Sequence, residues 1–255
     1  MNQDYIGKVV VITGASSGIG AALSKEIATR GGFVVLVGRN LERLTQVMAQ
    51  CPGSTFIQAD ITNKSEVDGV CAEALARYGQ IDIWVNNAGR GISRNLLDLS
   101  EEDVDEMIKD NVKSVVFGMQ AVLPYFQEVG QGVLANVSSM LGRIPAAPAR
   151  SAYSAAKAAV VSLTETARME FESSLPEVRF VTVFPGAVAT DFGNNSLGGG
   201  IDSRAIPNAQ DVMEVAQVIA DGLMSGPVDL YTRIHGAEAA IGHIKKLANI
   251  SSVIS

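Results

Sequence analysis

Short runs of β-branched and other apolar residues alternate along the chain with longer stretches whose apolar residues recur at helical spacing. This alternation is typical of a parallel sheet, because each parallel crossover needs a helix-length connection. Strands are predicted at Val9–Ile12, Phe33–Val37, Thr55–Gln58, Ile81–Val85, Gly132–Val137, Val178–Phe184 and Val228–Tyr231. Helices are predicted at Ile19–Arg30, Leu41–Gln50, Lys64–Tyr78, Glu101–Glu128, Ala152–Glu172 and Ala209–Met224, with Asn63 and Ser100 as N-caps. We therefore expect an α/β fold: one doubly wound, seven-stranded parallel sheet with helices on both faces, forming a single domain over residues 1–255.

Composition excludes several classes of function. Of 255 residues, 47% are hydrophobic and 18% charged, which is too apolar for a disordered chain or a coiled coil. The net charge of −7, without a basic cluster, argues against nucleic acid as a partner. The two cysteines and two histidines form no ligand pattern, so we expect no metal. Apolar runs are too short to span a membrane and no leader precedes the first strand, so we expect a cytoplasmic protein without membrane attachment.

The segment Thr13–Gly20, TGASSGIG, stands between the first predicted strand and the first predicted helix. Gly14, Gly18 and Gly20 fall where a tight turn needs positive φ and where a helix N-terminus binds a diphosphate. Their spacing is not the common G-x-G-x-x-G. We interpret the segment as a dinucleotide-binding turn rather than a purely structural one.

Tyr153 and Lys157 lie four residues apart in a predicted helix, so their side chains share one face, about 5–6 Å apart at Cβ. A free tyrosine has a pKa near 10, and a neighbouring ammonium is expected to lower that pKa. Such a pair is common on helices by chance. The pair indicates a catalytic site here because Ser139 follows the fifth predicted strand and the glycine turn follows the first.

Taken in order, the motifs resemble those of the short-chain dehydrogenase/reductase family from about Gly7 to Thr190. The matching motifs are TGxxxGxG at Thr13–Gly20, NNAG at Asn86–Gly89, Asn111, SxxG at Ser139–Gly142, YxxxK at Tyr153–Lys157, and PG at Pro185 and Gly186 followed by Thr190. The resemblance implies a Rossmann fold and an oxidoreductase that transfers a hydride between a nicotinamide cofactor and a carbonyl or secondary alcohol.

The resemblance also implies roles for four catalytic residues. Tyr153 is the general acid in carbonyl reduction, and Ser139 donates a hydrogen bond to the same substrate oxygen. Lys157 assists Tyr153 and holds the nicotinamide ribose, while Asn111 anchors a water that connects Lys157 to solvent. Ser138 is the alternative serine, but Gly142 stands three residues after Ser139, as the SxxG motif requires.

The cofactor is expected along the ends of several strands. The resemblance places Asp60 at the adenine amino group, although this carboxylate also suits the start of the following helix, and it places Asn86 and Ala88 in the wall beside the nucleotide. The residues expected to bind the cofactor are Gly14, Ser16, Ser17, Gly18, Ile19, Gly20, Arg39, Asp60, Ile61, Asn87, Ala88, Gly89, Tyr153, Lys157, Pro185, Gly186, Val188 and Thr190.

Cofactor preference follows from the end of the second strand. An acidic residue there would bond the ribose 2′-OH, but this position holds Gly38, followed by Arg39. An arginine favours a 2′-phosphate, so we expect NADP(H) rather than NAD(H), with Ser16 as a second phosphate ligand. The alternative is that Arg39 is a solvated residue at a helix start.

The substrate pocket is the least constrained part of the site. Two prolines stand between Ser139 and Tyr153, and the loop is one residue longer than is common in the family. The candidate lining residues are Arg90, Ile92, Met140, Arg143 and Phe192. Because the neighbouring candidates are mostly apolar, we expect a small hydrophobic substrate. Either arginine would bind a substrate anion if it pointed inward, but we favour surface positions for both. Residues 187–208 are predicted to form a lid, with an ordinary surface loop as the alternative.

The C-terminal segment 233–255 departs from the family pattern. Ala237–Ile250 has helical spacing that suits packing on its own domain, a subunit contact or a lid, with a membrane surface ranked last. The family resemblance implies a homodimer or homotetramer assembled through the two long helices predicted at Glu101–Glu128 and Ala152–Glu172.

Two other functions are considered besides an NADP(H)-dependent reductase. A non-catalytic NADP(H)-binding regulator would not need both Tyr153 and Lys157. A sugar-nucleotide epimerase or dehydratase generally needs a larger substrate domain than the residues after Thr190 provide.

Overall fold

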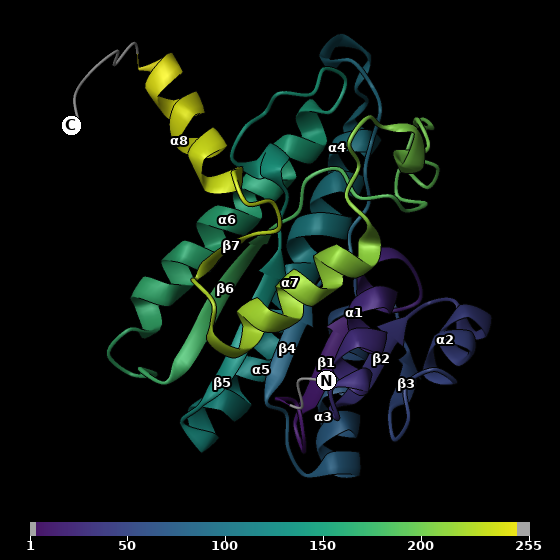
Figure 1. The fold of residues 1–255 in the computed structure, drawn as a ribbon, viewed down its shortest axis with the longest axis vertical. Helices are drawn as coiled ribbons and strands as arrows, with labels where there is room; N and C mark the ends of the chain where they lie inside the picture. Colours follow the sequence, from purple (N-terminus) through teal and green to yellow (C-terminus); the bar gives the residue numbers. More distant parts are fainter. Residues whose placement is uncertain (1–3, 249–255) are drawn as a thin grey trace.

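A single parallel sheet with the strand order β3-β2-β1-β4-β5-β6-β7 forms the centre of the molecule (Figure 1). The computed structural model describes residues 4–248. The strands are β1 Val9–Thr13, β2 Phe33–Gly38, β3 Thr55–Gln58, β4 Ile83–Asn86, β5 Gly132–Val137, β6 Val178–Phe184 and β7 Asp229–Tyr231. The α-helices are α1 Gly18–Thr29, α2 Leu41–Met48, α3 Lys64–Tyr78, α4 Glu101–Ile108, α5 Ser114–Val129, α6 Ser151–Phe171, α7 Val212–Ser225 and α8 Gly236–Leu247. The predicted fold class is confirmed.

The sheet reverses its winding direction between β1 and β4, which are neighbours although two strands separate them in the sequence. Helices then cover both faces, because each parallel connection crosses over one face or the other (Figure 1). In such sheets the crevice at the carboxyl ends of the strands beside this point is where ligands bind. The topology therefore fixes where a site is to be sought.

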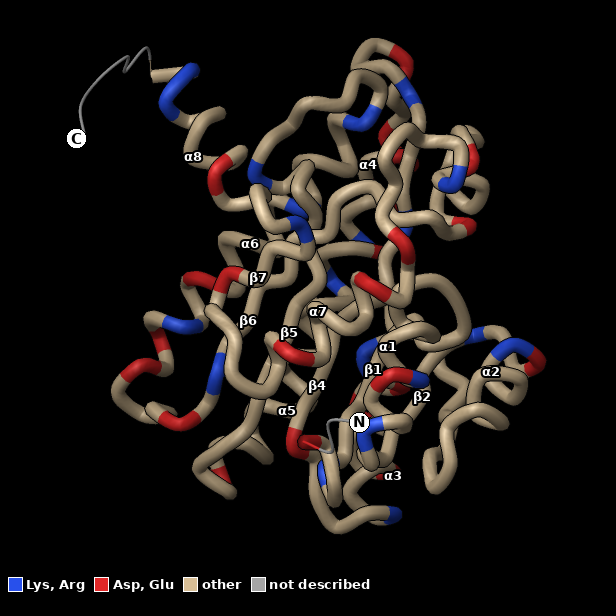
Figure 2. Tube along the Cα trace, viewed as in Figure 1, with Lys and Arg blue, Asp and Glu red and all other residues tan. Residues whose placement is uncertain are grey.

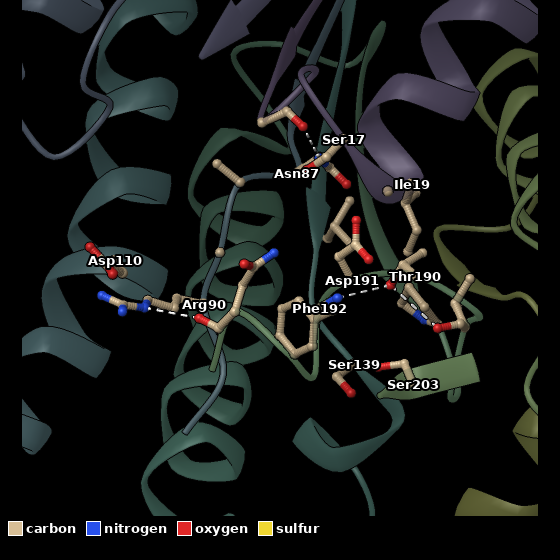
Figure 3. Close-up of a pocket in the computed structure, with 18 of the residues that line it drawn as sticks. Ser17, Ile19, Asn87, Arg90, Asp110, Ser139, Thr190, Asp191, Phe192 and Ser203 are labelled. Carbon is tan, nitrogen blue, oxygen red and sulfur yellow. Dashed lines mark hydrogen bonds between the residues drawn. The ribbon is translucent and has the colours of Figure 1, made fainter. Parts of the chain in front are cut away.

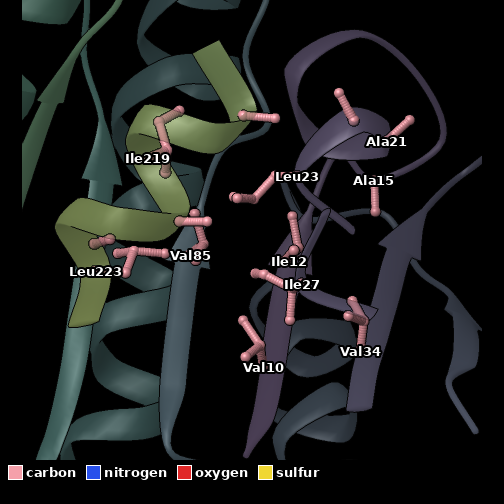
Figure 4. Close-up of a cluster of buried hydrophobic side chains, with 14 of the residues drawn as sticks. Val10, Ile12, Ala15, Ala21, Leu23, Ile27, Val34, Val85, Ile219 and Leu223 are labelled. Atoms are coloured by element: carbon pink, nitrogen blue, oxygen red, sulfur yellow. The ribbon is translucent and has the colours of Figure 1, made fainter. Parts of the chain in front are cut away.

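Two apolar layers hold the helices on the sheet. One face of the sheet packs α1 and α7 against β1 and β4 through side chains that include Ile12, Leu23, Ile27, Ile219 and Leu223 (Figure 4). The other face packs α3, α5 and α6 around large buried residues that include Trp84, Phe126, Val160 and Phe180. The strands are buried on both faces, which explains why their sequences are runs of apolar residues rather than alternating patterns.

Helix boundaries follow the capping residues. The side chain of Asn63 accepts a hydrogen bond from Ser65 N at the start of α3. Ser100 forms a capping box with Asp103 at the start of α4. Both predicted N-caps are confirmed.

One predicted helix is divided. The single helix expected over Glu101–Glu128 is observed as α4 and α5, joined by the π-helical turn η2, Lys109–Lys113. A π-turn inserts a residue into the helix and shifts the side chains that follow. Periodicity does not reveal such an insertion, and it lies at Asn111, one of the candidate catalytic residues.

The C-terminal helix α8 projects from the body of the molecule (Figure 1). Ile241, Ile244 and Leu247 on this helix are exposed, while Ala240 is buried. Packing along its own domain therefore accounts for only the start of the helix, and the end of the predicted segment lies outside the described residues. The homodimer or homotetramer stays a prediction.

Charges are mixed over the surface. Lys and Arg positions are interspersed with Asp and Glu along the whole trace (Figure 2). Within residues 4–248 no helix combines the length and the apolar character that a membrane crossing requires.

Candidate active site

The turn between β1 and α1 forms the floor of a cradle at the switch point. Gly14 and Gly18 both have positive φ, +68° and +55°, which side chains rarely adopt. A Cβ on Gly14 would also stand 2.9 Å from Cα of Ala88, so the turn lies directly against the segment that follows β4. Ser17 precedes α1, and its side chain makes no capping hydrogen bond to any described residue. The first turn of α1 therefore offers free N–H groups, which fits the diphosphate of a dinucleotide.

A cavity of about 790 Å³ extends from this cradle along the carboxyl ends of the strands. It brings together most of the residues predicted from the sequence (Figure 3). Those lining it are Gly14, Ser16, Ser17, Gly18, Ile19, Arg39, Asp60, Ile61, Asn87, Ala88, Gly89, Arg90, Ser139, Met140, Tyr153, Lys157, Pro185, Gly186, Val188, Thr190 and Phe192. Two ends of the cavity differ in chemistry, and we call them the nucleotide end and the catalytic end.

The nucleotide end lies beyond β2 and β3. Arg39 and Arg43 line it, and both are exposed. A Cβ on Gly38 would stand 3.4 Å from Ser16 Oγ, so this hydroxyl lies beside the end of β2. Asp60 Oδ1 accepts hydrogen bonds from Thr62 N, 3.0 Å, and Thr62 Oγ1, 2.8 Å. Burial tends to raise the pKa of Asp60, but these bonds and the Arg39 charge lower it overall, so the carboxylate is held ionised.

The catalytic end combines Ser139, which follows β5, with Tyr153 and Lys157 from the first turns of α6. Lys157 Nζ donates to the carbonyl oxygen of Val137, 2.9 Å away. Ser139 Oγ accepts from Leu141 N, 3.1 Å away, and lines the cavity. Ser138 Oγ instead donates to the Lys157 carbonyl, 2.8 Å away. Both serines line the cavity, but the Ser138 hydroxyl is taken up by the bond to α6, so the geometry fits the choice of Ser139, whose catalytic role stays a prediction.

Burial dominates the electrostatics of this end. It raises the pKa of Tyr153 to about 12, while a hydrogen bond with Ser139 and the charge of Arg150 act in the opposite direction. Burial also lowers the pKa of Lys157 to about 8. The expectation that Lys157 lowers the pKa of Tyr153 is therefore not what the site shows, since burial raises this pKa and the opposing contributions come from Ser139 and Arg150. Lys157 Nζ bonds Val137 and lies 5.8 Å from the centre of the Tyr153 ring.

Asn111 lies behind the catalytic end, in the π-turn η2. Its Nδ2 donates to the carbonyl oxygens of Arg90, 3.0 Å, and Met107, 3.1 Å, and its Oδ1 accepts from Arg90 N, 3.2 Å. A Cβ on Gly89 would stand 2.7 Å from Asn111 Oδ1 and 3.1 Å from Lys157 Nζ. Asn111 and Lys157 thus flank the same glycine, although Asn111 itself does not line the cavity.

Several predicted residues are not brought to the cavity. Arg143 bonds Glu165, 2.5 Å, and Asp229, 2.6 Å, and its guanidinium lies 5.0 Å from the Phe184 ring centre, so it faces the sheet edge rather than the substrate. Ile92 is fully buried and packs against Tyr153 from behind.

Two nucleotide-side expectations also need correction. Gly20 lies next to the Gly14 carbonyl inside the turn, where a Cβ would collide with it, and does not line the cavity. Asn86 faces away from the nucleotide, because its Oδ1 accepts from Trp84 Nε1, 2.8 Å, and its Nδ2 donates to Asn136 Oδ1, 2.8 Å. Both residues support the site without facing it.

Sequence reasoning missed four charged residues of the cavity: Arg43, Asp110, Arg150 and Asp191. Arg43 stands in the first turn of the predicted helix at Leu41–Gln50, soon after Arg39, so its place at the start of this helix could have found it. Asp110 precedes Asn111 in the π-turn η2, so helical spacing does not predict which way its side chain points. Arg150 precedes Tyr153 by three residues, just before the predicted start of its helix, and no motif marks it.

The segment 187–208 covers the catalytic end. Its backbone joins the chain after β4, since Leu197 N donates to the Gly91 carbonyl, 2.9 Å away, and Ser93 N donates to the Leu197 carbonyl, 2.9 Å away. Phe192 places its ring centre 5.7 Å from that of Tyr153. This position fits the predicted lid, and its motion stays a prediction.

A doubly wound sheet with a glycine turn at its switch point and Ser139, Tyr153 and Lys157 at one cavity defines a nucleotide-binding oxidoreductase. The chain belongs to the short-chain dehydrogenase family, whose model matches residues 8–197. An uncharacterized oxidoreductase of Staphylococcus epidermidis is 37% identical over 193 residues, which is 73% of this chain and 83% of that protein.

Solved structures show the same fold. A short-chain dehydrogenase/reductase from Burkholderia phymatum in complex with NAD has a TM-score of 0.86 at 24% identity and covers 99% of both chains, which supports the fold alone. A short-chain dehydrogenase from Sphingobium yanoikuyae in complex with NADPH has a TM-score of 0.81 at 28% identity and covers 97% of both chains. These two proteins bind different nicotinamide cofactors.

Proposed function

We propose that this chain is an NADP(H)-dependent oxidoreductase that transfers a hydride between the nicotinamide and a carbonyl or secondary alcohol of a small substrate. The observation that carries the proposal is one cavity with Ser139, Tyr153 and Lys157 at one end and Arg39 and Arg43 at the other. Met140, Leu141, Ala147, Phe192 and Ile206 supply an apolar wall for the hydrocarbon part of the substrate.

The nucleotide end supports NADP(H). A 2′-phosphate carries about two negative charges, and two guanidinium groups with the Ser16 hydroxyl offer donors for them. Gly38 contributes no carboxylate at the position where one would bond a free ribose 2′-OH. Asp60 is ionised and available to an amino group of the adenine ring.

The catalytic end supports proton delivery in the reductive direction. When bound, the cofactor supplies a hydride to the carbonyl carbon. The Tyr153 hydroxyl then gives its proton to the carbonyl oxygen, which yields the alcohol. The raised pKa of Tyr153, about 12, keeps this proton in place at neutral pH until it is needed. The Ser139 hydroxyl donates a hydrogen bond to the same oxygen as negative charge develops there. The Lys157 ammonium returns a proton to the Tyr153 oxygen after the reduction, and Asn111, whose Oδ1 lies near the same glycine, Gly89, as Lys157 Nζ, is the residue we propose to hold the water that resupplies Lys157.

The test is NADPH oxidation by the wild-type protein against a panel of ketones, aldehydes, quinones and acyl-thioesters. We expect clear turnover of at least one class, and a loss of roughly 10²- to 10⁴-fold in kcat for Tyr153→Phe with the NADPH dissociation constant unchanged. NADPH binding without turnover across the panel would contradict the proposal and favour a non-catalytic NADP(H)-binding regulator. Near-normal turnover by the Phe variant would remove Tyr153 from the mechanism.

A further inference from the structure

The arginines of the described chain differ in what surrounds them. Outside the cavity, Arg94 pairs with Asp103, Arg143 with Glu165 and Asp229, and Arg204 with Asp191. The arginines that line the cavity, Arg39, Arg43, Arg90 and Arg150, form no ion pair with any residue in the range 4–248. Two of them are at the nucleotide end, where the cofactor brings phosphates. The other two, Arg90 and Arg150, line the rest of the cavity together with the carboxylates Asp110 and Asp191, and Asp191 is already paired with Arg204.

Arg150 has fewer polar contacts than Arg90, the other arginine at the catalytic end. Arg90 Nε donates to the Asn195 carbonyl, 3.2 Å away, and Asp110 lies close enough for the Arg90 charge to lower its pKa, although burial raises that pKa overall (Figure 3). Arg150 is half-buried, and its guanidinium makes no hydrogen bond to any other described residue. Removing a cation partly from water without a partner is unfavourable, so a ligand that supplies one would be bound strongly.

The surroundings of Arg150 place it beside the reacting groups. It precedes α6 and stands three residues before Tyr153, whose pKa its charge lowers against the larger effect of burial. A Cβ on Gly91 would stand 3.2 Å from Arg150 Nη1, 2.9 Å from Phe192 Cε1 and 2.6 Å from Ser196 Oγ. Arg150 and Phe192 line the cavity here, whereas Gly91 and Ser196 are packed behind them, and we call the cavity wall formed by Arg150 and Phe192 the Arg150 corner.

We propose that the Arg150 corner binds a carboxylate of the substrate, so that the preferred substrates are carbonyl compounds that carry a carboxylate in addition to the reacting carbonyl. The inference rests on the proposed function and names its substrate class. A guanidinium presents two parallel N–H donors that match the two oxygens of a carboxylate. One unpaired guanidinium also balances a monoanion, whereas a phosphate dianion would leave a charge uncompensated. The apolar wall then takes the carbon chain between the carbonyl and the surface.

The experiment compares straight-chain oxo acids, which differ in the number of carbons between ketone and carboxylate, with their methyl esters. Wild-type protein and NADPH are expected to give a kcat/KM at least tenfold higher for the best acid than for its ester. Arg150→Gln should lower kcat/KM for the acid by roughly 10- to 100-fold and bring the acid close to the ester. Arg150→Lys should restore part of the preference for the acid over the ester, because lysine keeps the positive charge but lacks the two parallel N–H donors. Arg77→Gln, which removes an exposed arginine of α3 outside the cavity, is the matched control.

A second measurement does not depend on turnover. The saturated acid of the same length has no carbonyl, and its dissociation constant from the protein–NADPH complex is followed by NADPH fluorescence. We expect binding that weakens in Arg150→Gln by the same factor as kcat/KM and that the methyl ester does not reproduce.

The outcomes separate this inference from the proposed function. Equal turnover of acid and ester by the wild type would overturn the carboxylate site and leave the reductase in place. An equal loss for acid and ester in Arg150→Gln, with a shifted pH profile for both, would also overturn it, because Arg150 would then act only on Tyr153. If no carbonyl is reduced, the proposed function fails, and the fluorescence titration decides the inference: Arg150-dependent binding supports it and no binding overturns it.

Discussion

The two ends of the cavity place similar charged groups in opposite surroundings. At the nucleotide end Arg39 and Arg43 are exposed, and the Asp60 carboxylate is held ionised by hydrogen bonds. At the catalytic end Tyr153 and Lys157 are buried. Burial raises the pKa of Tyr153 and lowers that of Lys157, so it favours the neutral form of each side chain. The nucleotide end is therefore suited to recognising fixed charges, and the catalytic end to moving a proton.

The difference has an energetic meaning. Charges in contact with water are screened, so each contact at the nucleotide end contributes modestly and several are needed for cofactor choice. At the catalytic end little water competes, so a single hydroxyl directed at the substrate oxygen has a large effect on rate. Substitutions at the catalytic end should change kcat strongly, and those at the nucleotide end should change cofactor affinity.

The largest expected effect separates the two adjacent serines. Ser139→Ala removes the donor to the substrate oxygen and should lower kcat by about 10²- to 10³-fold with little change in NADPH affinity. Ser138→Ala removes the hydrogen bond to the Lys157 carbonyl and should instead lower the free energy of unfolding by about 1–3 kcal/mol, with a loss in kcat of less than about tenfold. Steady-state kinetics and thermal unfolding of both variants check this. A larger loss of kcat for Ser138→Ala would reverse the assignment.

A smaller effect is expected at the nucleotide end. Arg39→Gln should weaken NADPH binding by roughly 10- to 100-fold, because it removes charge-assisted hydrogen bonds to the 2′-phosphate, and it should leave the dissociation constant of NADH nearly unchanged. Arg43→Gln should act in the same direction. Fluorescence titration with both cofactors measures the ratio, and Arg77→Gln again serves as the control. Equal weakening of NADPH and NADH binding would show that Arg39 does not bind the 2′-phosphate.

Much of the fold and of the nucleotide end could be predicted because local sequence determines them. Apolar runs mark buried parallel strands, and the turn at Gly14–Gly20 needs glycine for backbone reasons that a motif records. Arg39 was predicted because its position follows directly from the end of a strand. The π-turn at Asn111 was not, since one inserted residue hardly changes the apolar period.

The catalytic end was harder to predict because long-range packing decides side-chain direction there. Arg90, Arg143 and Arg150 all lie in loops near the site, and the sequence gives no reason to prefer one. Arg143 turns away because Glu165 and Asp229 bind it, and those residues come from α6 and β7. Arg150 lines the cavity and has no such partner among residues 4–248. The electrostatics of Tyr153 also depended on burial, which spacing along a helix does not measure.

A pH-dependent effect on stability tests whether water is excluded from the catalytic end as its burial indicates. Burial lowers the pKa of Lys157 to about 8 in the folded protein, below its value near 10.4 in an unfolded chain. Between these two values the unfolded state binds more protons, so this group makes the protein more stable as pH rises, and its unfavourable contribution is complete below pH 8. Lys157→Met removes the group together with its hydrogen bond to Val137, and the lost bond adds an offset that is the same at every pH.

The free energy of unfolding of the Met variant minus that of the wild type should therefore fall between pH 7 and pH 10, by at most about 3 kcal/mol. Denaturant unfolding of both proteins measures it. The pKa of Tyr153 is raised to about 12 in the folded protein but is near 10 in the unfolded chain, and this contribution is common to both proteins and cancels in the difference. A difference that stays constant over this range would mean that water reaches the ammonium. The contrast between a wet nucleotide end and a dry catalytic end would then fail, and the large effect expected for Ser139 would lose its physical basis.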